Sequence, residues 1–358
     1  MNSAVDSCSS EVHTVVIGAG QAGLAAAYYL RRAGVPFVVL DERAAVGEVW
    51  AGRYDSLRLF SPAWASNLPG LPWPGRGRRY PTKQEAAAYL RQYAEHFRLP
   101  IETGQRVTSV QPAPGGFLVR TAAGRRISTR QLIVCTGPYT APKVPAFSQS
   151  LPPATQQLHS SQYLRPAQIS DSGPVAVVGS GNSALQIAAD LAAAGQREVF
   201  VAFDEKTPAM PNNTAMWVLL LGTGLLQVGR NSVVGRLLRS RPEPVVRQDL
   251  RRLRQFPNVH FIGRALHATA AATLQGQRRA TPPLSAVIWA TGFGPDYSWL
   301  QVPGALDPTG QPRHARGLSP VPGLAFLGLP WLHSRRSALM GGAGSDAAYV
   351  VASLLKKT

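Results

Sequence analysis

The sequence predicts an α/β protein built from two Rossmann-like dinucleotide-binding domains with three layers, the second inserted into the first. An apolar run, a glycine-rich turn, an alanine-rich stretch and a second apolar run ending in an acid follow one another at 15–43 and again at 175–206. This order is typical of a strand, a turn, a helix and a second strand. Two apolar runs at 284–294 and 323–331 then indicate that the chain returns to complete the first domain.

The first glycine-rich turn has the full context of a pyrophosphate-binding turn. Gly18, Gly20 and Gly23 form a GxGxxG pattern behind an apolar run, and Asp41 ends the next apolar run. The first glycine permits the tight turn, the second lets the backbone approach a pyrophosphate, and the third allows close packing of helix on strand. The helix expected from Gln21 adds unpaired N–H groups for that pyrophosphate. Asp41 is then placed to accept hydrogen bonds from ribose hydroxyls.

The second glycine-rich turn is the GxGxxA variant of the same pattern. It follows the apolar run VAVV and precedes another alanine-rich segment, so the same strand, turn and helix are expected. The candidate cofactor-binding residues of this turn are Gly179, Gly181, Asn182, Ser183 and Ala184.

Two dinucleotide sites in one chain imply two dinucleotides, and the simplest chemistry for the pair is hydride transfer from a nicotinamide to a flavin. We therefore expect FAD at the first turn and NADPH or NADH at the second. An enzyme committed to NADP offers an arginine for the 2′-phosphate near the end of the strand after the turn. This chain has Asp204 there, with Lys206 close behind, so the sequence leaves the choice of nicotinamide open.

The segment that follows the first unit has the pattern of a helix and a group of strands. The stretch 81–100 predicts a helix with Thr82 as its N-cap and Glu85 completing a capping box. Short strands separated by Gly and Pro are expected after it, at 106–112, 116–121 and 125–137.

A proline-rich connection begins at Pro138 and leads into the second copy of the pattern. A closing helix is expected at 344–358. These observations divide the chain into a mobile tail at 1–12, an FAD-binding domain at 13–145 and 285–358, and an inserted NAD(P)-binding domain at 160–280.

The chain carries a formal net charge of +18, with 32 Arg and 5 Lys. Because this arginine bias accompanies abundant Ala, Gly and Pro, it indicates a compositional origin. The run 230–254 holds eight Arg against Glu243 and Asp249, which is typical of a solvated helical face and would also attract an anionic cofactor. No zinc-finger or RNP-type motif accompanies it, so no nucleic-acid partner is expected.

The two cysteines are Cys8, in a polar N-terminal stretch, and Cys135, at the end of an apolar run. Their separation predicts no structural disulfide and suits a reducing compartment. The first residues also lack the basic and apolar regions of a secretory signal. We therefore expect a cytoplasmic protein, and the sequence leaves a homodimer open.

The stretch 207–229 carries no formal charge and contains the strongly apolar run 215–228. This run is too short to span a bilayer, since a membrane helix needs about 20 residues, and the prolines of PAMPNN break any longer helix. We expect a buried helix or the wall of an apolar cavity, with no integral membrane association. Peripheral contact with a membrane stays open.

Further motifs accompany the two turns: VGEVWAGRYDSLRLFSP at 46–62, VCTGPYTAPKVP at 134–145, WATGF at 289–293 and GLAFLGLPWLHSRRSALMGGAGSDAA at 323–348. With them, nearly the whole chain after the tail resembles the class B flavin-dependent monooxygenases, above all the small bacterial flavin-containing monooxygenases. The resemblance implies that NADPH or NADH reduces FAD and that O2 then gives a peroxyflavin. One oxygen atom passes from it to a small sulfur, nitrogen or ketone substrate.

The resemblance also implies roles for two residues between the turns. Trp50, in the VGEVW turn, is expected near the flavin, with an ordinary core position as the alternative. Asn67 stands where family members place an asparagine near the reactive edge of the flavin, so it is the candidate catalytic residue. A neutral amide can donate a hydrogen bond there. An asparagine before Leu-Pro is equally a turn residue.

Thr136-Gly137 and Thr291-Gly292 match the paired segments through which the family links its two domains, although the first reads CTG in place of ATG. A Thr-Gly pair behind a buried strand lets the chain leave the sheet at its carboxyl edge, where ligands bind. The HSSQY motif at 159–163 matches only the second half of the family fingerprint, which weakens assignment to a subclass. We expect His159 to link the domains.

Two alternatives to oxygenation remain at this stage. The protein could be an NAD(P)H oxidase or flavin reductase whose reduced flavin yields hydrogen peroxide, or a redox sensor that binds dinucleotides without turnover. No close cysteine pair supports electron transfer to a disulfide, and no histidine or cysteine spacing is typical of a metal site, so none is expected.

Overall fold

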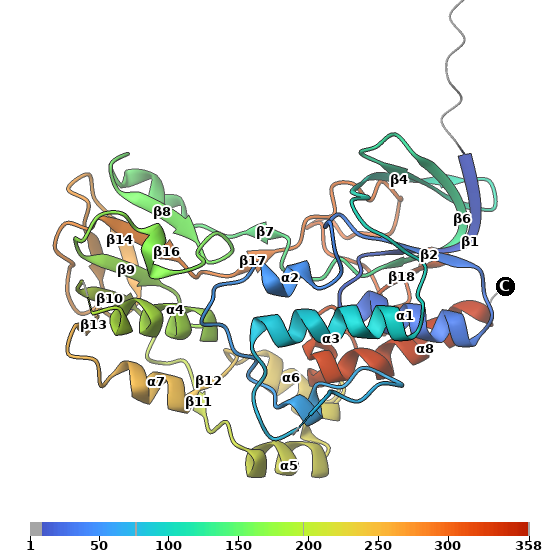
Figure 1. Ribbon diagram of the computed structural model, residues 1–358. Helices are drawn as coiled ribbons and strands as arrows, with labels where there is room; N and C mark the ends of the chain where they lie inside the picture. Colours follow the sequence, from blue (N-terminus) through green and yellow to red (C-terminus); the bar gives the residue numbers. More distant parts are fainter. Residues whose placement is uncertain (1–8, 76, 196, 357–358) are drawn as a thin grey trace, which may run out of the picture.

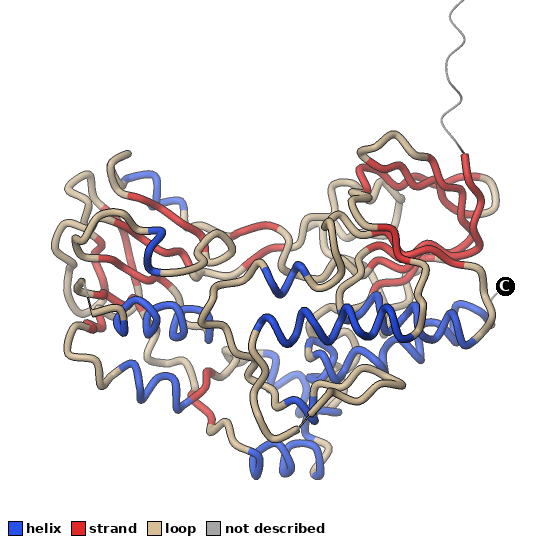
Figure 2. Tube along the Cα trace, in the orientation of Figure 1, coloured by secondary structure: helices blue, strands red, loops and turns tan. Residues whose placement is uncertain are grey.

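The computed structural model describes residues 9–75, 77–195 and 197–356. Within these residues two separate sheets stand side by side, each with its helices, and are joined by a narrow middle region (Figure 1). Figure 2 shows the same division, with strands gathered at the two sides and the long helices below them. The predicted fold class, two Rossmann-like domains, is confirmed.

The first sheet has a parallel part and an antiparallel part. Its strand order is β3-β2-β1-β6-β5-β4, and β18 pairs with β6 beside this path. Strands β1, β2, β3, β6 and β18 pair in parallel, whereas β4, β5 and β6 form an antiparallel meander. The strands are β1 (Ser9–Ile17), β2 (Phe37–Leu40), β3 (Ile101–Glu102), β4 (Val107–Ala113), β5 (Gly116–Thr121), β6 (Arg126–Val134) and β18 (Leu324–Phe326).

Three long helices cover one face of this sheet: α1 (Gln21–Arg32), α3 (Lys83–His96) and α8 (Ala343–Leu355) (Figure 1). The alanines of α1 are buried, which lets α1 pack closely on the parallel strands. Helix α3 begins with the predicted capping box, in which the Thr82 hydroxyl accepts from the Glu85 N–H and the Glu85 carboxylate accepts from the Thr82 N–H. The closing helix α8 confirms the helix expected near the C-terminus.

The second sheet is parallel throughout, with the order β13-β10-β9-β16-β8. Its strands are β8 (Gln156–His159), β9 (Val175–Val178), β10 (Val199–Ala202), β13 (Val259–Phe261) and β16 (Ala286–Trp289). Helices α4 (Asn182–Ala193) and α7 (Arg247–Leu253) lie on one face, and the hairpin β14 (Ala265–Ala268)–β15 (Leu274–Gly276) lies near the other (Figure 1). All side chains of β9 and β10 are buried: the valines at 175, 177, 199 and 201 pack in the core on one face, and the residues between them pack in the core on the other, as a parallel sheet requires.

The sheets place the ends of the inserted unit differently from the sequence prediction. Both β8 and β16 pair within the second sheet, so this unit spans 156–289 and not 160–280. A short buried run such as AVIW does not itself indicate which sheet it joins, because that depends on the strands beside it. Likewise β1 begins at Ser9, so part of the predicted tail is strand, and Cys8 lies outside the described residues.

Two further short ribbons and a helical excursion lie outside the two sheets. Strand β7 (Ala141–Pro142) pairs antiparallel with β17 (Phe293–Gly294) in the middle region, and β11 (Ala209–Met210) pairs with β12 (Val245–Val246). Between β11 and β12 the chain forms α5 (Thr214–Gly222) and α6 (Val233–Arg239). No helix among the described residues is long and apolar enough to cross a bilayer.

Candidate dinucleotide sites and the junction between them

The first glycine-rich turn joins β1 to α1 with no room for side chains at two positions. Gly18 has a φ of +102°, and a Cβ there would lie 2.7 Å from the carbonyl oxygen of Cys135 on the neighbouring strand. A Cβ on Gly23 would lie 1.8 Å from the Gly18 carbonyl oxygen. At Gly20 a Cβ would meet nothing within 4 Å. The first two glycines therefore bring helix and sheet together, while Gly20 leaves open space in front of the N-terminus of α1 at Gln21.

A cavity of about 530 Å³ opens directly at this turn. It is larger than a second cavity of about 340 Å³, which lies away from the turn. The wall of the larger cavity comes from the turn, the end of β2, the start of the short helix α2 (Glu48–Ala51), the end of β6 and the segment before Leu300. The predicted residues among its lining are Gly18, Gly20, Asp41 and Thr136. The volume lies in the range of small-molecule sites. The fold thus brings together residues that are far apart in sequence.

Asp41 joins the end of β2 to the glycine-rich turn. One carboxylate oxygen accepts a hydrogen bond from the backbone N–H of Ala19 at 2.5 Å, and the other accepts from the N–H of Arg43 at 2.9 Å. Both bonds hold the carboxylate at the wall of the larger cavity. This is the position from which an acid would meet ribose hydroxyls.

Trp50 lies on α2, whose close approach to α3 is possible because Gly47 has no side chain: a Cβ there would lie 2.5 Å from the Ala87 carbonyl oxygen. The indole packs against the core of the first unit and does not line the cavity, although Glu48 and Val49 beside it do. Its Nε1–H is buried without a hydrogen-bond partner in the described structure. A buried donor without a partner is costly.

Asn67 takes part in a loop and lines neither of the two cavities. Its amide nitrogen donates to the carbonyl oxygen of Trp64 at 3.0 Å, and its amide oxygen accepts from the backbone N–H of Trp73 at 2.7 Å. These bonds are those of the turn residue that the sequence offered as the alternative. The catalytic role assigned to Asn67 stays a prediction.

The second glycine-rich turn repeats the close approach of the first. A Cβ on Gly179 would lie 2.2 Å from the carbonyl oxygen of Ala290, on the end of β16, and a Cβ on Gly181 would meet nothing within 4 Å. Ala184 is fully buried where α4 meets the sheet. Asn182, the first residue of α4, accepts a hydrogen bond through its side-chain oxygen from the backbone N–H of Val246 at 2.8 Å.

The end of β10 faces this second turn, and the fold adds a basic residue there that the sequence pattern did not indicate. The backbone N–H of Asp204 donates to the Ser180 hydroxyl at 2.7 Å, and the Asp204 carboxylate accepts from the N–H of Lys206 at 3.0 Å. Next to Asp204, the carboxylate of Glu205 forms an ion pair with Arg278. Because Arg278 follows β15, far along the chain, no local pattern could have found it.

The two Thr-Gly pairs leave the two sheets at equivalent places. Thr136-Gly137 follows β6, the parallel partner of β1, and Thr291-Gly292 follows β16, the parallel partner of β9. The Thr291 hydroxyl donates to the carbonyl oxygen of Lys143, so the segment that follows β6 and the segment that follows β16 are hydrogen-bonded to each other. Both pairs therefore stand where the carboxyl edges of the two sheets face the middle region.

His159 ends β8 and holds the second of these connections. Its Nδ1 accepts from the backbone N–H of Ser161 at 3.2 Å, so Nε2 carries the proton and donates to the Gly292 carbonyl oxygen at 2.9 Å. Burial lowers the pKa of His159, and the hydrogen bond to Gly292 offsets part of that fall. The ring also stands edge to face against Phe293. These contacts are those of the linking role that we expected for His159.

Arg53 lies at the same junction and was not singled out from the sequence. Its guanidinium lies 5.2 Å from the centre of the Phe293 ring, and Phe293 packs edge to face with Tyr139 behind Thr136-Gly137. Burial lowers the pKa of Arg53. A cation held over an aromatic ring, with much of its water removed, is a strong donor for an anionic or polar group. A lone arginine in a loop gives no sequence signal for such a position.

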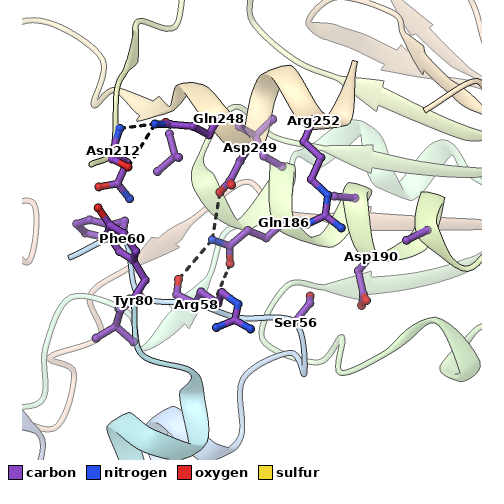
Figure 3. A pocket seen from close by; sticks show the side chains of 15 residues that line it. Ser56, Arg58, Phe60, Tyr80, Gln186, Asp190, Asn212, Gln248, Asp249 and Arg252 are labelled. Atoms are coloured by element: carbon purple, nitrogen blue, oxygen red, sulfur yellow. Dashed lines mark hydrogen bonds between the residues drawn. The ribbon is translucent and has the colours of Figure 1, made fainter. Parts of the chain in front are cut away.

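Gln186 on α4 binds the loop of the first unit at the smaller cavity (Figure 3). Its amide oxygen accepts from the Tyr54 hydroxyl at 3.1 Å and from the Arg58 N–H at 3.3 Å, while its nitrogen donates to the Arg58 carbonyl and to Asp249. Burial raises the pKa of Tyr54 to about 12, and a hydrogen bond with Ser183 offsets part of that rise. The first turn of α4 is thereby tied to the other unit.

Comparisons with known proteins agree with this architecture. The family model described as pyridine nucleotide-disulphide oxidoreductase matches residues 15–219. An uncharacterized CzcO-like oxidoreductase of Geobacillus kaustophilus is 40% identical over 349 residues, which cover 96% of this chain and 98% of that protein. The indole-3-pyruvate monooxygenase YUCCA1 of Oryza sativa subsp. japonica is 35% identical over 190 residues, which cover 52% of this chain and 47% of that protein.

A solved structure extends the likeness over the whole fold. The flavin-containing monooxygenase from Stenotrophomonas maltophilia has 30% sequence identity and a TM-score of 0.78, covering 97% of this chain and 99% of that one. Both units of the fold, and therefore both glycine-rich turns, fall within this likeness.

Proposed function

Since this chain belongs to the pyridine nucleotide-disulphide oxidoreductase family and is a class B flavin monooxygenase-like member of it, we propose the following activity. It is an NAD(P)H-dependent FAD monooxygenase that inserts one oxygen atom of O2 into a small sulfur, nitrogen or ketone substrate. The observation that carries the proposal is the pair of glycine-rich turns, each at a carboxyl sheet edge that faces the same junction.

The residues at the first turn fit FAD. Gly20 leaves space before the N-terminus of α1, where N–H groups suit a pyrophosphate, and Asp41 stands at the wall of the adjoining cavity. When bound, FAD would accept two electrons from NAD(P)H as a hydride and would then react with O2.

The residues at the second turn fit a nicotinamide dinucleotide. Gly181 leaves its side of the turn open, and α4 begins directly behind it. The ion pair of Glu205 with Arg278 stands beside Asp204, where a 2′-phosphate would be read. Arg278 favours that phosphate, while the two carboxylates disfavour it. This arrangement supports use of both NADPH and NADH.

The protein's own residues mainly hold and orient the segments around the two cofactor sites. His159 donates a hydrogen bond to the carbonyl oxygen of Gly292. This bond fixes the segment that carries Phe293, whose ring contacts the Arg53 guanidinium. Its low pKa keeps the ring neutral near neutral pH, so the donated proton stays in place. Arg53, partly stripped of water, offers guanidinium donors at the junction where a nicotinamide and a flavin would meet. Tyr139, which lines the larger cavity, packs edge to face on Phe293 at this junction.

The disulphide chemistry in the family description does not fit the described residues. Cys135 is their free cysteine, and it is buried against the first turn. Burial raises the pKa of this thiol, so the thiolate that disulfide exchange requires is disfavoured. Cys135 instead fills space beside Gly23.

An NAD(P)H oxidase or flavin reductase is the second candidate function, and the position of Asn67 favours it. The side-chain oxygen and nitrogen of Asn67 are both bonded within its loop and line neither cavity. If the Asn67 amide does not donate at the reactive edge, activated oxygen would leave as hydrogen peroxide before it reached a substrate.

The stoichiometry of turnover separates the two functions. The purified chain is reconstituted with FAD and given NADPH or NADH, air and methyl phenyl sulfide, and the sulfoxide, the hydrogen peroxide and the oxidised nicotinamide are measured together. We expect sulfoxide to match nicotinamide consumed. Peroxide in that amount, with no oxygenated product from sulfide, amine or ketone probes, would establish the oxidase. A flavin that stays oxidised when NADPH or NADH is added without air would reject both.

A further inference from the structure

Helix α5 has an apolar surface that the fold leaves uncovered. Its sequence, TAMWVLLLG, carries no charge on any side, and such helices are normally buried in a core or in lipid. Here it lies at the outer edge of the molecule (Figure 1). Val218 is 57% exposed and Leu219 is 55% exposed, whereas Trp217 is buried. The expected buried helix is therefore buried on one side only.

The buried side fixes α5 firmly to the body of the protein. Trp217 packs with Ala65 and Leu226, and its indole N–H donates to the Asn212 side chain at 2.8 Å. Asn213 caps the helix by accepting from the Met216 N–H. The exposed side of α5 is thus presented by a supported helix.

The chain that follows α5 adds apolar and basic groups. Val233, Val234 and Leu237 of α6 are 74%, 48% and 53% exposed. Arg236 and Arg239, on the same helix, are exposed too. We refer to these five exposed side chains, together with Val218 and Leu219 of α5, as the α5–α6 surface.

The segment that carries this surface has charge of one sign. Between Glu205 and Glu243 the sequence contains no Asp or Glu, while it contains arginines at 230, 236, 239 and 241. Glu243 itself lies 3.5 Å from Arg335, so the first acid after the surface already has a basic neighbour. An apolar surface whose own segment carries arginines and no acid is complementary to an anionic lipid headgroup layer.

We propose that the α5–α6 surface attaches the protein to the face of an anionic membrane. A helix of nine residues is about 14 Å long and cannot span a bilayer, so Val218 and Leu219 would enter the headgroup region while the arginines bind lipid phosphates. A second copy is a poorer occupant. A symmetric contact would bring the same arginine-bearing surface against itself, with no acid to pair it.

The test is sedimentation of the full FAD-loaded chain with vesicles of phosphatidylcholine, with and without phosphatidylglycerol. We expect binding to the phosphatidylglycerol vesicles and its loss at high salt. Leu219→Glu should lower that binding by about tenfold or more. Arg236→Gln should lower it by about fivefold. Absence of binding by the unchanged protein would overturn the proposal.

Matched variants exclude general effects. Leu266→Glu, at a 50% exposed leucine of β14, and Arg91→Gln, at an exposed arginine of α3, should bind vesicles like the unchanged protein. Flavin content and thermal midpoint are measured for every variant, so a misfolded protein is recognised. If Leu219→Glu binds vesicles normally, or if it instead abolishes a dimer seen in solution, the surface serves a second copy and the membrane proposal is wrong.

Discussion

The two glycine-rich turns share their backbone geometry and differ in what surrounds them. In each, the first glycine lies against a carbonyl oxygen at the end of the neighbouring parallel strand, Cys135 for Gly18 and Ala290 for Gly179. The acids behave differently. Asp41 reaches back to its turn through its carboxylate, whereas Asp204 does so through its backbone N–H. Strand–turn–helix packing thus depends on the glycines, which the turns share, and the hydrogen bonds made to each turn are where the two differ.

The largest expected effect comes from filling the crowded glycine positions. Gly18→Ala adds a Cβ at positive φ and 2.7 Å from the Cys135 carbonyl oxygen, so we expect the free energy of unfolding to fall by about 2–4 kcal/mol. Gly179→Ala should cost a similar amount, since its Cβ would lie 2.2 Å from the Ala290 oxygen. Chemical denaturation measures both.

Gly20→Ala and Gly181→Ala are the controls for that comparison, because nothing lies within 4 Å of the added Cβ. We expect unfolding free energies within about 1 kcal/mol of the unchanged protein. Flavin binding should weaken for Gly20→Ala alone, and reduction by NADPH or NADH should weaken for Gly181→Ala alone. Equal loss of flavin in both variants would contradict the assignment of one cofactor to each turn.

The next effect concerns the nicotinamide. Glu205→Gln removes the carboxylate that pairs with Arg278, so Arg278 becomes available to a 2′-phosphate. We expect the ratio of kcat/KM for NADPH to that for NADH to rise by about tenfold, since one charge-assisted bond contributes about 1.5 kcal/mol. Steady-state kinetics with each nicotinamide measures it.

Glu198→Gln is the matched control, because Glu198 pairs with His260 in the same unit and away from the second turn. In Glu198→Gln the ratio of kcat/KM for NADPH to that for NADH should equal that of the unchanged protein. A rise there as large as for Glu205→Gln would show that Arg278 does not read the phosphate.

A smaller effect is expected where the two units touch. Tyr54→Phe removes the hydroxyl that donates to Gln186, and a buried hydrogen bond of this kind contributes about 1 kcal/mol. The loss should appear in unfolding by denaturant. Tyr349→Phe, in which the hydroxyl removed belongs to a half-buried residue of α8, is the comparison and should change the midpoint less. Equal losses of unfolding free energy in the two variants would mean that the hydrogen bond between the units adds nothing to stability.

The smallest effect is a dependence on pH at the junction. Burial lowers the pKa of His159 in the folded protein, so the unfolded chain binds its proton first as the solution becomes acidic. Stability from this residue is complete above about pH 6.5, the pKa of an unperturbed histidine, and falls as pH drops below it.

His159→Gln keeps a side-chain donor for Gly292 and cannot be protonated, so the part of the pH dependence due to His159 should disappear. Thermal midpoints at neutral and mildly acidic pH should then differ by a few degrees less than in the unchanged protein, about 2–4 °C. An identical pH profile would contradict the role of His159.

The sequence predicted those parts of the fold that rest on local pattern. Both turns, the capping box at Thr82 and Glu85, and the strands around Cys135 have signals within a few residues. It could not assign β16 to a sheet, since a four-residue apolar strand fits either, and the mostly polar β8, QQLH, has no strand pattern of its own. The inserted unit was therefore placed too narrowly.

The candidate site was predictable to a similar limit. Gly18, Gly20, Asp41 and Thr136 meet at one cavity, as the first turn and the resemblance indicated. Arg278, Arg53 and Gln186 could not be found, because each acts through a contact between distant segments and each residue type is common on surfaces. For Asn67 the sequence left two roles open, and its hydrogen bonds are those of a turn residue.

The ribbon of β7 and β17 limits how the halves of the protein can move. The chain passes from one half to the other at this ribbon in both directions, and the two passages are hydrogen-bonded side by side. Two unpaired connecting segments could move independently of each other, whereas two hydrogen-bonded segments bend together. The two passages must therefore bend together, so any movement of the inserted half is restricted to directions in which this ribbon stays paired.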